Sequence, residues 1–182
     1  SLLMQVKNRK VATSMAPSAV RGLFMQQGKR NDTVLMQATH KVNFDLTYRL
    51  DFPEMNALYR RAVANQWDGD RDLDWSIAVD PMSPEIPIIG EDFLPLDGLA
   101  EYGVKLNARE AAQANYNVVC WMLSQFMHGD QGALYASAQV TESVQWMDGK
   151  FYGATQVMDE GRHLEVFLRY LDTKLQKSYQ IN

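Results

Sequence analysis

The chain has 182 residues, of which 46% are hydrophobic and 22% charged, so it can bury a sizeable core and has an ordinary globular composition. Its formal net charge of −4 offers no basic stripe for the phosphates of nucleic acids, which argues against nucleic-acid binding. The sequence contains no apolar run of the length that a transmembrane helix needs and no secretory signal, so we expect no membrane partner. Its single cysteine, Cys120, cannot form an internal disulfide, which favours a reducing, cytoplasmic location.

Residues 1–105 are predicted to form an irregular arm with short helices and proline-rich loops, because all six prolines lie there. One helix is predicted to begin near Pro17 and to end by Gly28. A second is predicted from Pro53 to about Trp67, since proline suits the first helical turn and apolar residues follow at helical spacing.

Two other segments of the arm, around His40 and after Asp68, have patterns that predict local structure. Around His40, alternating polar and apolar residues predict an extended segment, and we expect no ligand role for this histidine. The acidic run that starts at Asp68 resembles a calcium loop only superficially. Leu73 and Val79 stand where such a loop needs glycine and glutamate, so we expect an acidic turn.

Residues 106–182 are predicted to form one long antiparallel helix pair. Asn107 and Glu110 have the spacing of a capping box, and no proline follows them. A turn is expected near residue 145, because the segment 143–149 contains serine, aspartate and glycine.

The second predicted helix contains the motif Glu160-x-x-His163. Residues three apart project from one helix face, so this carboxylate and this imidazole can bind one metal ion. Di-iron carboxylate bundles use the same spacing for their ligands. Taken alone the motif is weak, because exposed helices also contain it by chance.

Asp130 is the candidate third ligand. In one straight helix Asp130 and Glu160 would lie about 45 Å apart, but a turn near residue 145 would bring them to the same level. Phe126 and Leu134 share the helix face of Asp130, so its carboxylate would be costly to bury unless it were paired or bound to metal. The alternative is that the neighbouring glycines break the helix and leave Asp130 in water.

Three residues are candidates for a supporting role around the ligands. Asp159 could accept the free N–H of a metal-bound histidine, and Arg162 could anchor that acid. Gln156, one turn before Glu160, could hydrogen-bond a metal-bound water. The alternatives are a surface ion pair for the first two and ordinary packing for Gln156.

The motif Asp159-Glu160-x-Arg162-His163, with an acid thirty residues earlier, resembles the first half-site of the ferritin-like di-iron enzymes. These include the bacterial multicomponent monooxygenase hydroxylases and the ribonucleotide reductase small subunit. The resemblance covers residues 107–176 and implies an all-α, ferritin-like helical bundle. It also implies that Asp130 is a terminal ligand of the first iron, Glu160 a bridge between two irons, and His163 a ligand of the first iron.

The function implied by this resemblance is an O2-activating di-iron oxygenase or oxidase. It would act on a small organic molecule by hydroxylation, N-oxygenation or desaturation, with a reductase or ferredoxin as electron donor, and it would be a homodimer. A di-manganese or Mn/Fe oxidase is an open alternative, because these ligands do not decide among the metals. A metal-binding or scaffold subunit without its own catalysis is the other alternative.

Three departures from the family pattern qualify this expectation. Asp130 stands where glutamate is usual, although reductase-type members have aspartate there. Phe167 stands where the reductases have their radical-bearing tyrosine, which favours an oxygenase or oxidase. After His163 the chain offers only Glu165 as a further glutamate before a short polar end, and no second Glu-x-x-His. We therefore expect the second half-site to come from the rest of a longer protein, from a partner chain, or from a symmetry-related copy.

Overall fold

The computed structural model describes residues 39–83 and 85–181, together with Arg9, Thr13, Ala16, Pro17, Val20 and Phe24. The described residues form helices and loops, without a β-strand. Ala16, Pro17 and Val20 are helical, in agreement with the helix predicted near Pro17, but both ends of that helix lie outside the described residues. Contacts divide the chain into two units, and every element below belongs to the unit Ala38–Tyr179.

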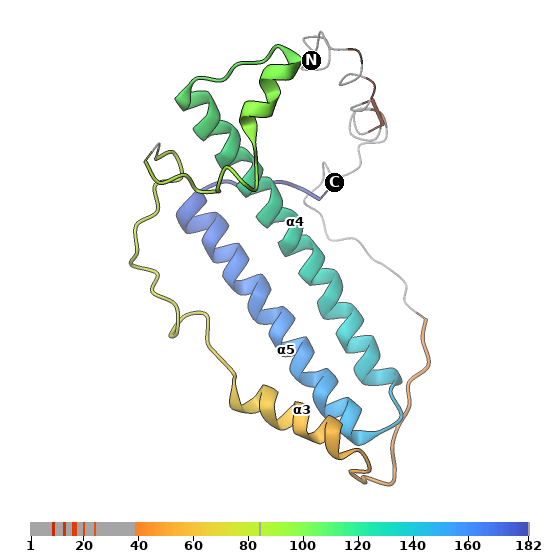
Figure 1. Ribbon diagram of the computed structural model, residues 1–182. Coiled ribbons are helices and arrows are strands. Elements are labelled where there is room, and N and C mark those ends of the chain that lie inside the picture. The colour runs from red at the N-terminus through yellow and green to blue at the C-terminus, as the bar shows by residue number, and fades with distance from the viewer. Residues whose placement is uncertain are drawn as a thin grey trace. The chain divides into compact units, whose positions relative to one another are not determined.

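Two long helices form the predicted antiparallel pair (Figure 1). Helix α4 spans Ala108–Ser143, and helix α5 spans Met147–Tyr170. The predicted capping box starts α4: the Asn107 side chain accepts from the Glu110 N–H at 3.0 Å, and the Glu110 carboxylate accepts from the Asn107 N–H at 2.9 Å. The turn falls at residues 144–146, where the backbone becomes extended, so the prediction of a turn near residue 145 is confirmed.

Helices α4 and α5 approach each other closely at Gly153. A Cβ atom built on Gly153 would lie 2.5 Å from Oγ1 of Thr141 and 3.3 Å from its Cα. The hydroxyl of Thr141 donates to the Ser137 carbonyl at 2.8 Å, which holds it in place. Glycine at this position therefore sets the distance between the two helices.

Replacing Gly153 by alanine is expected to lower the free energy of unfolding by about 1–3 kcal/mol, because the methyl group would push the helices apart. Urea denaturation followed by circular dichroism measures the change. Gly132 provides a matched control, because a Cβ there would meet nothing within 4 Å. Gly132→Ala is expected to raise stability by about 0.5–1 kcal/mol through helix propensity. Equal effects of the two substitutions would contradict the close approach.

The buried core lies toward the start of α4 and the end of α5. Val119, Cys120, Leu171 and Leu175 are buried together, and Cys120 has no exposed surface, in keeping with a packing role. After α5 the chain makes one π-helical turn, η2 (Leu171–Leu175), and folds back along α4. Three hydrogen bonds hold this returning segment against α4. The Tyr116 OH donates to the Leu175 carbonyl at 2.6 Å, the Tyr179 N–H donates to Ser124 Oγ at 2.9 Å, and His128 Nε2 bonds the Tyr179 carbonyl at 3.0 Å.

Leu164, Leu168, Leu171 and Leu175 form a leucine stripe at helical spacing along the end of α5 and η2, but this stripe is not one continuous buried face. Leu171 and Leu175 are 2% exposed, whereas Leu168 is 61% exposed. The difference arises because the returning chain covers only the last turns of the helix. The outer part of the stripe remains an uncovered apolar surface.

Helix α3 spans Pro53–Ala64 and packs against α5. The Phe52 N–H donates to the fully buried carboxylate of Asp148 at 3.2 Å, and the rings of Tyr59 and Phe151 lie 5.4 Å apart. The helix ends three residues before the predicted end at Trp67. Side-chain amides of Asn65 and Gln66 bond the carbonyls of Arg61 and Ala62 at 2.7 and 2.9 Å, and the chain then leaves the helix.

The chain between α3 and α4 is mainly loop, with one 3₁₀ helix, η1 (Leu96–Tyr102), that the sequence pattern did not predict. The Asp68 carboxylate accepts the N–H groups of Asp70 and Arg71 at 2.9 Å, as expected for an acidic turn. None of the helices in the described part of the chain is long and apolar enough to cross a membrane.

Candidate metal centre

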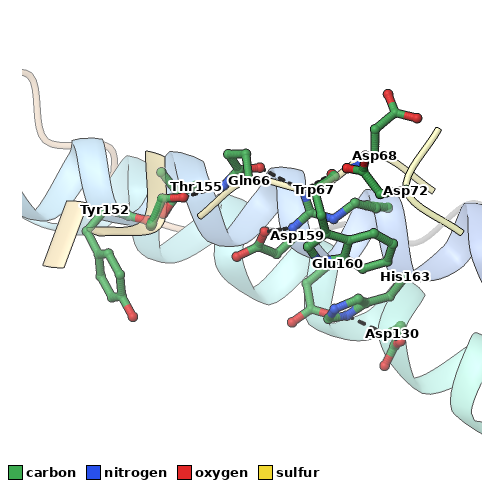
Figure 2. Close-up of polar contacts among 12 residues, drawn as sticks. Gln66, Trp67, Asp68, Asp72, Asp130, Tyr152, Thr155, Asp159, Glu160 and His163 are labelled. Atoms are coloured by element: carbon green, nitrogen blue, oxygen red, sulfur yellow. Dashed lines mark hydrogen bonds and ion pairs between the residues drawn. The ribbon is translucent and has the colours of Figure 1, made fainter. Parts of the chain in front are cut away.

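The helix hairpin brings the three predicted ligands together. Asp130 projects from α4 and Glu160 and His163 from α5, and their ligand atoms all lie within 4.8 Å of one another. Nδ1 of His163 lies 3.3 Å from Oε2 of Glu160 and 3.7 Å from Oδ2 of Asp130 (Figure 2). In the described ranges, this is the one group of at least three acidic, histidine or cysteine side chains with such a spacing.

Asp130 does not sit at a helix break. Helix α4 continues through Gly129, Asp130 and Gly132, and the Asp130 side chain is 26% exposed. The helix break that the alternative requires is therefore absent, and Asp130 is partly buried.

The three candidate ligands include two neighbouring carboxylates that repel each other. Burial raises the pKa of the Asp130 carboxyl, the nearby Glu160 carboxylate raises it further, and His163 opposes both effects. A cation held between the two carboxylates would remove their mutual repulsion. Two carboxylates and one imidazole form a ligand set that suits iron or manganese, so the residues present fit the implied metal.

Arg162 lies between the two α5 ligands in sequence and connects α5 to the chain after α3. Its guanidinium donates through Nη1 to Gln66 Oε1 and to the Trp67 carbonyl, both at 2.7 Å, and through Nη2 to the Asp159 carboxylate. It also stacks on the Trp67 ring at 4.5 Å. Because Arg162 is only 9% exposed, the alternative of an ordinary surface ion pair is wrong.

The supporting residues occupy the positions expected for them, but their roles toward a metal stay predictions. The partner of Asp159 is Arg162, as predicted, and the proposed acceptance of a histidine N–H by Asp159 has no counterpart in the described contacts. Gln156 lines the same cavity as Glu160 and His163.

Two cavities flank the three ligands, and Trp67 and His163 line both. One, of about 280 Å3, is largely apolar and also has Phe126, Asp130, Val166 and Phe167 in its wall. The rings of Phe126 and Phe167 lie 6.3 Å apart. The other, of about 270 Å3, is polar, and its remaining lining residues are Ala62, Asn65, Gln66, Gln156, Asp159, Glu160 and Arg162. The cluster therefore has an apolar side and a more polar side.

Reasoning from the sequence missed the part that Gln66 and Trp67 play at this centre. Both lie on the loop after α3, nearly a hundred residues from Arg162. Their sequence pattern is that of a helix end, and no motif marks them. The one signal in the sequence was Arg162 itself, whose guanidinium has more N–H donors than Asp159 alone can accept.

No protein-family model matches the chain, and no curated protein or solved structure is detectably similar to it. The ferritin-like assignment therefore depends on the residues described above.

Proposed function

We propose that this chain provides the first half-site of an O2-activating non-haem di-iron oxygenase or oxidase with a ferritin-like bundle. The observation that carries the proposal is the convergence of Asp130, Glu160 and His163 from two antiparallel helices, with ligand atoms within 4.8 Å of one another. In this assignment Asp130, His163 and Glu160 would hold iron, and Glu160 would be the carboxylate that the resemblance assigns to both metal positions. The irons, when bound, supply the activation of O2, and the protein supplies ligands, orientation and a shaped pocket.

The apolar cavity supports an oxidation of a small organic substrate. Trp67, Phe126, Val166 and Phe167 surround a space that opens onto Asp130 and His163. Such a wall offers a binding surface for an apolar group beside the candidate ligands. Hydroxylation, N-oxygenation and desaturation all fit this arrangement, with electrons from a reductase or ferredoxin.

Phe167 supports an oxygenase or oxidase over a ribonucleotide reductase subunit. Its ring lies in the cavity wall close to the candidate ligands, at the position where the reductases carry a radical-bearing tyrosine. Phenylalanine has no phenolic hydroxyl and cannot form a tyrosyl radical.

The proposed centre needs further ligands, and the helix pair offers a surface on which they could be supplied. Large apolar side chains of α4 and α5 are 44–61% exposed: Trp121, Phe126, Tyr135, Val140, Met158 and Leu168. Exposed apolar surface of this kind on a helix pair is suited to packing against further helices. These helices would carry a second glutamate and Glu-x-x-His, from the same protein, a partner chain or a second copy.

Oxygen uptake after anaerobic loading with ferrous iron tests the proposal on the natively purified assembly. The wild-type protein is expected to consume O2 faster than Glu160→Ala, which lacks the bridging carboxylate. Glu165→Ala is the matched control, because Glu165 is an exposed acid on the same helix and is expected to have no effect. Equal O2 uptake by the wild type and Glu160→Ala would contradict the assignment. Uptake after loading with Mn2+ but not with Fe2+ would favour the manganese alternative.

A further inference from the structure

Trp67 lies at the boundary between the two cavities that flank the candidate ligands. Apart from His163, it is the one described residue in the wall of both the apolar cavity, of about 280 Å3, and the polar cavity, of about 270 Å3. Its side chain extends from the loop after α3 toward Glu160 and His163 (Figure 2). An indole offers only an N–H donor and cannot bind a metal ion. Trp67 therefore separates the two cavities without being a candidate ligand itself.

Two contacts with Arg162 hold the indole in this position. The guanidinium stacks on the Trp67 ring at 4.5 Å, and Nη1 donates to the Trp67 carbonyl at 2.7 Å. Arg162 is only 9% exposed and also bonds Gln66, the preceding residue, so its own side chain is held in place. One buried side chain thus holds both the face of the ring and the backbone that carries it. The ring cannot turn away from the cavities without losing the stack.

The loop that carries Trp67 also lies very close to α5. A Cβ atom built on Gly69 would lie 2.8 Å from Cγ2 of Val166 and 3.8 Å from Cζ3 of Trp67. Val166 is in the wall of the apolar cavity, and the absence of a side chain at Gly69 allows the loop to close against it. The Trp75 indole N–H donates to the Gly69 carbonyl at 2.6 Å and supports this approach. The close packing of the loop on α5 therefore fixes where the indole stands.

The apolar cavity selects a guest by size more than by hydrogen bonding. Its wall consists of Trp67, Phe126, Val166 and Phe167, together with the candidate ligands Asp130 and His163. No other hydrogen-bonding side chain lines it that could orient a polar guest. Its volume of about 280 Å3 lies just below the range of roughly 300–1,000 Å3 that is usual for small-molecule pockets. In such a cavity the position of each wall decides which apolar groups fit.

We propose that Trp67 determines which substrates this centre accepts, because its indole closes the apolar cavity on the side of the polar one. This inference rests on the proposed function, since it concerns the substrate of the same site. The group that enters beside Asp130 and His163 is then a single aromatic ring or an aliphatic group of similar size. A fused second ring is rejected, because the indole occupies the space that this ring would need. Removing the indole would join the two cavities beside His163.

Binding of two inert aromatic probes tests this role without relying on metal or O2 chemistry. Fluorobenzene and 1-fluoronaphthalene carry no group that binds a metal, and fluorine NMR measures the dissociation constant of each for the natively purified protein. In Trp67→Ala, the affinity for the larger probe relative to the smaller one is expected to rise at least about tenfold over the wild-type ratio, because the second ring gains buried surface. Trp67→Phe keeps a ring on Arg162 and is expected to give a smaller rise. It also replaces the alanine variant if that variant does not fold.

Trp121→Ala is the matched control for probe binding elsewhere on the protein. Trp121 is a tryptophan of α4 that is 44% exposed and lines neither cavity, so this variant is expected to keep the wild-type ratio. An unchanged ratio in a folded Trp67 variant, an equal rise in Trp121→Ala, or no binding of fluorobenzene to the wild type would overturn the proposal. If the ratio changes as expected but the protein binds no metal, the proposed function fails while Trp67 still controls the size of the guest.

Discussion

His163→Ala is expected to lower the affinity of the protein for its metal by more than about 100-fold. Loss of a residue that only hydrogen-bonds a metal ligand lowers metal affinity about 10–100-fold, and this substitution removes a candidate ligand itself. The imidazole lies within 3.7 Å of both carboxylates, so its removal takes away the nitrogen donor between the two acids. Metal content after dialysis against a weak chelator measures the effect.

His128→Ala is the matched control for this experiment. His128 is also a half-buried histidine of the helix pair, but its ring contacts the Tyr179 carbonyl at 3.0 Å and not the ligands. It is expected to retain the metal with at most a modest loss of stability. Full metal occupancy in His163→Ala, with folding preserved, would remove this residue from the ligand set.

Arg162→Met is expected to lower the free energy of unfolding by about 3 kcal/mol. The substitution keeps an unbranched side chain of similar length but removes the charge and three hydrogen bonds. The Trp67 carbonyl and the Asp159 carboxylate then lose a buried partner, and unpaired buried polar groups are costly. Thermal or urea unfolding measures the change, and α3 is expected to become more accessible to proteolysis.

Arg169 is a close control, because it lies two turns further along α5 with the same types of contact. It pairs with Asp70 and stacks on the Trp75 ring at 4.3 Å, but its side chain is 37% exposed. Exposed pairs contribute little, so Arg169→Met is expected to cost about 1 kcal/mol or less. Equal losses for the two variants would show that Arg162 is not the specific link between α3 and α5.

The helix pair and the ligand cluster could be predicted from the sequence because both depend on local spacing. The capping box at Asn107 fixes the start of α4, and the turn near residue 145 fixes which residues come level across the pair. Given that geometry, Glu160, His163 and Asp130 have to meet on one side. Helical periodicity and one turn position are sufficient for this inference.

The remaining features depend on contacts between residues distant in sequence, which no local pattern encodes. The end of α3 is set by where Gln66 and Trp67 reach Arg162, about 95 residues later. Leu171 and Leu175 are buried and Leu168 is exposed, because the chain after Leu175 folds back over only the end of this helix. Asn43 bonds the end of α4, about a hundred residues later, whereas the alternation around His40 predicts only an extended segment.

Metal content of the natively purified assembly, determined by elemental analysis together with intact mass on the same sample, tests the central claim most directly. The account predicts about two irons per complete bundle, and a mass showing either a longer chain or a second one that supplies the remaining ligands. Folded protein that carries no stoichiometric transition metal would contradict it, and would reduce Asp130, Glu160 and His163 to a polar cluster on a helical scaffold.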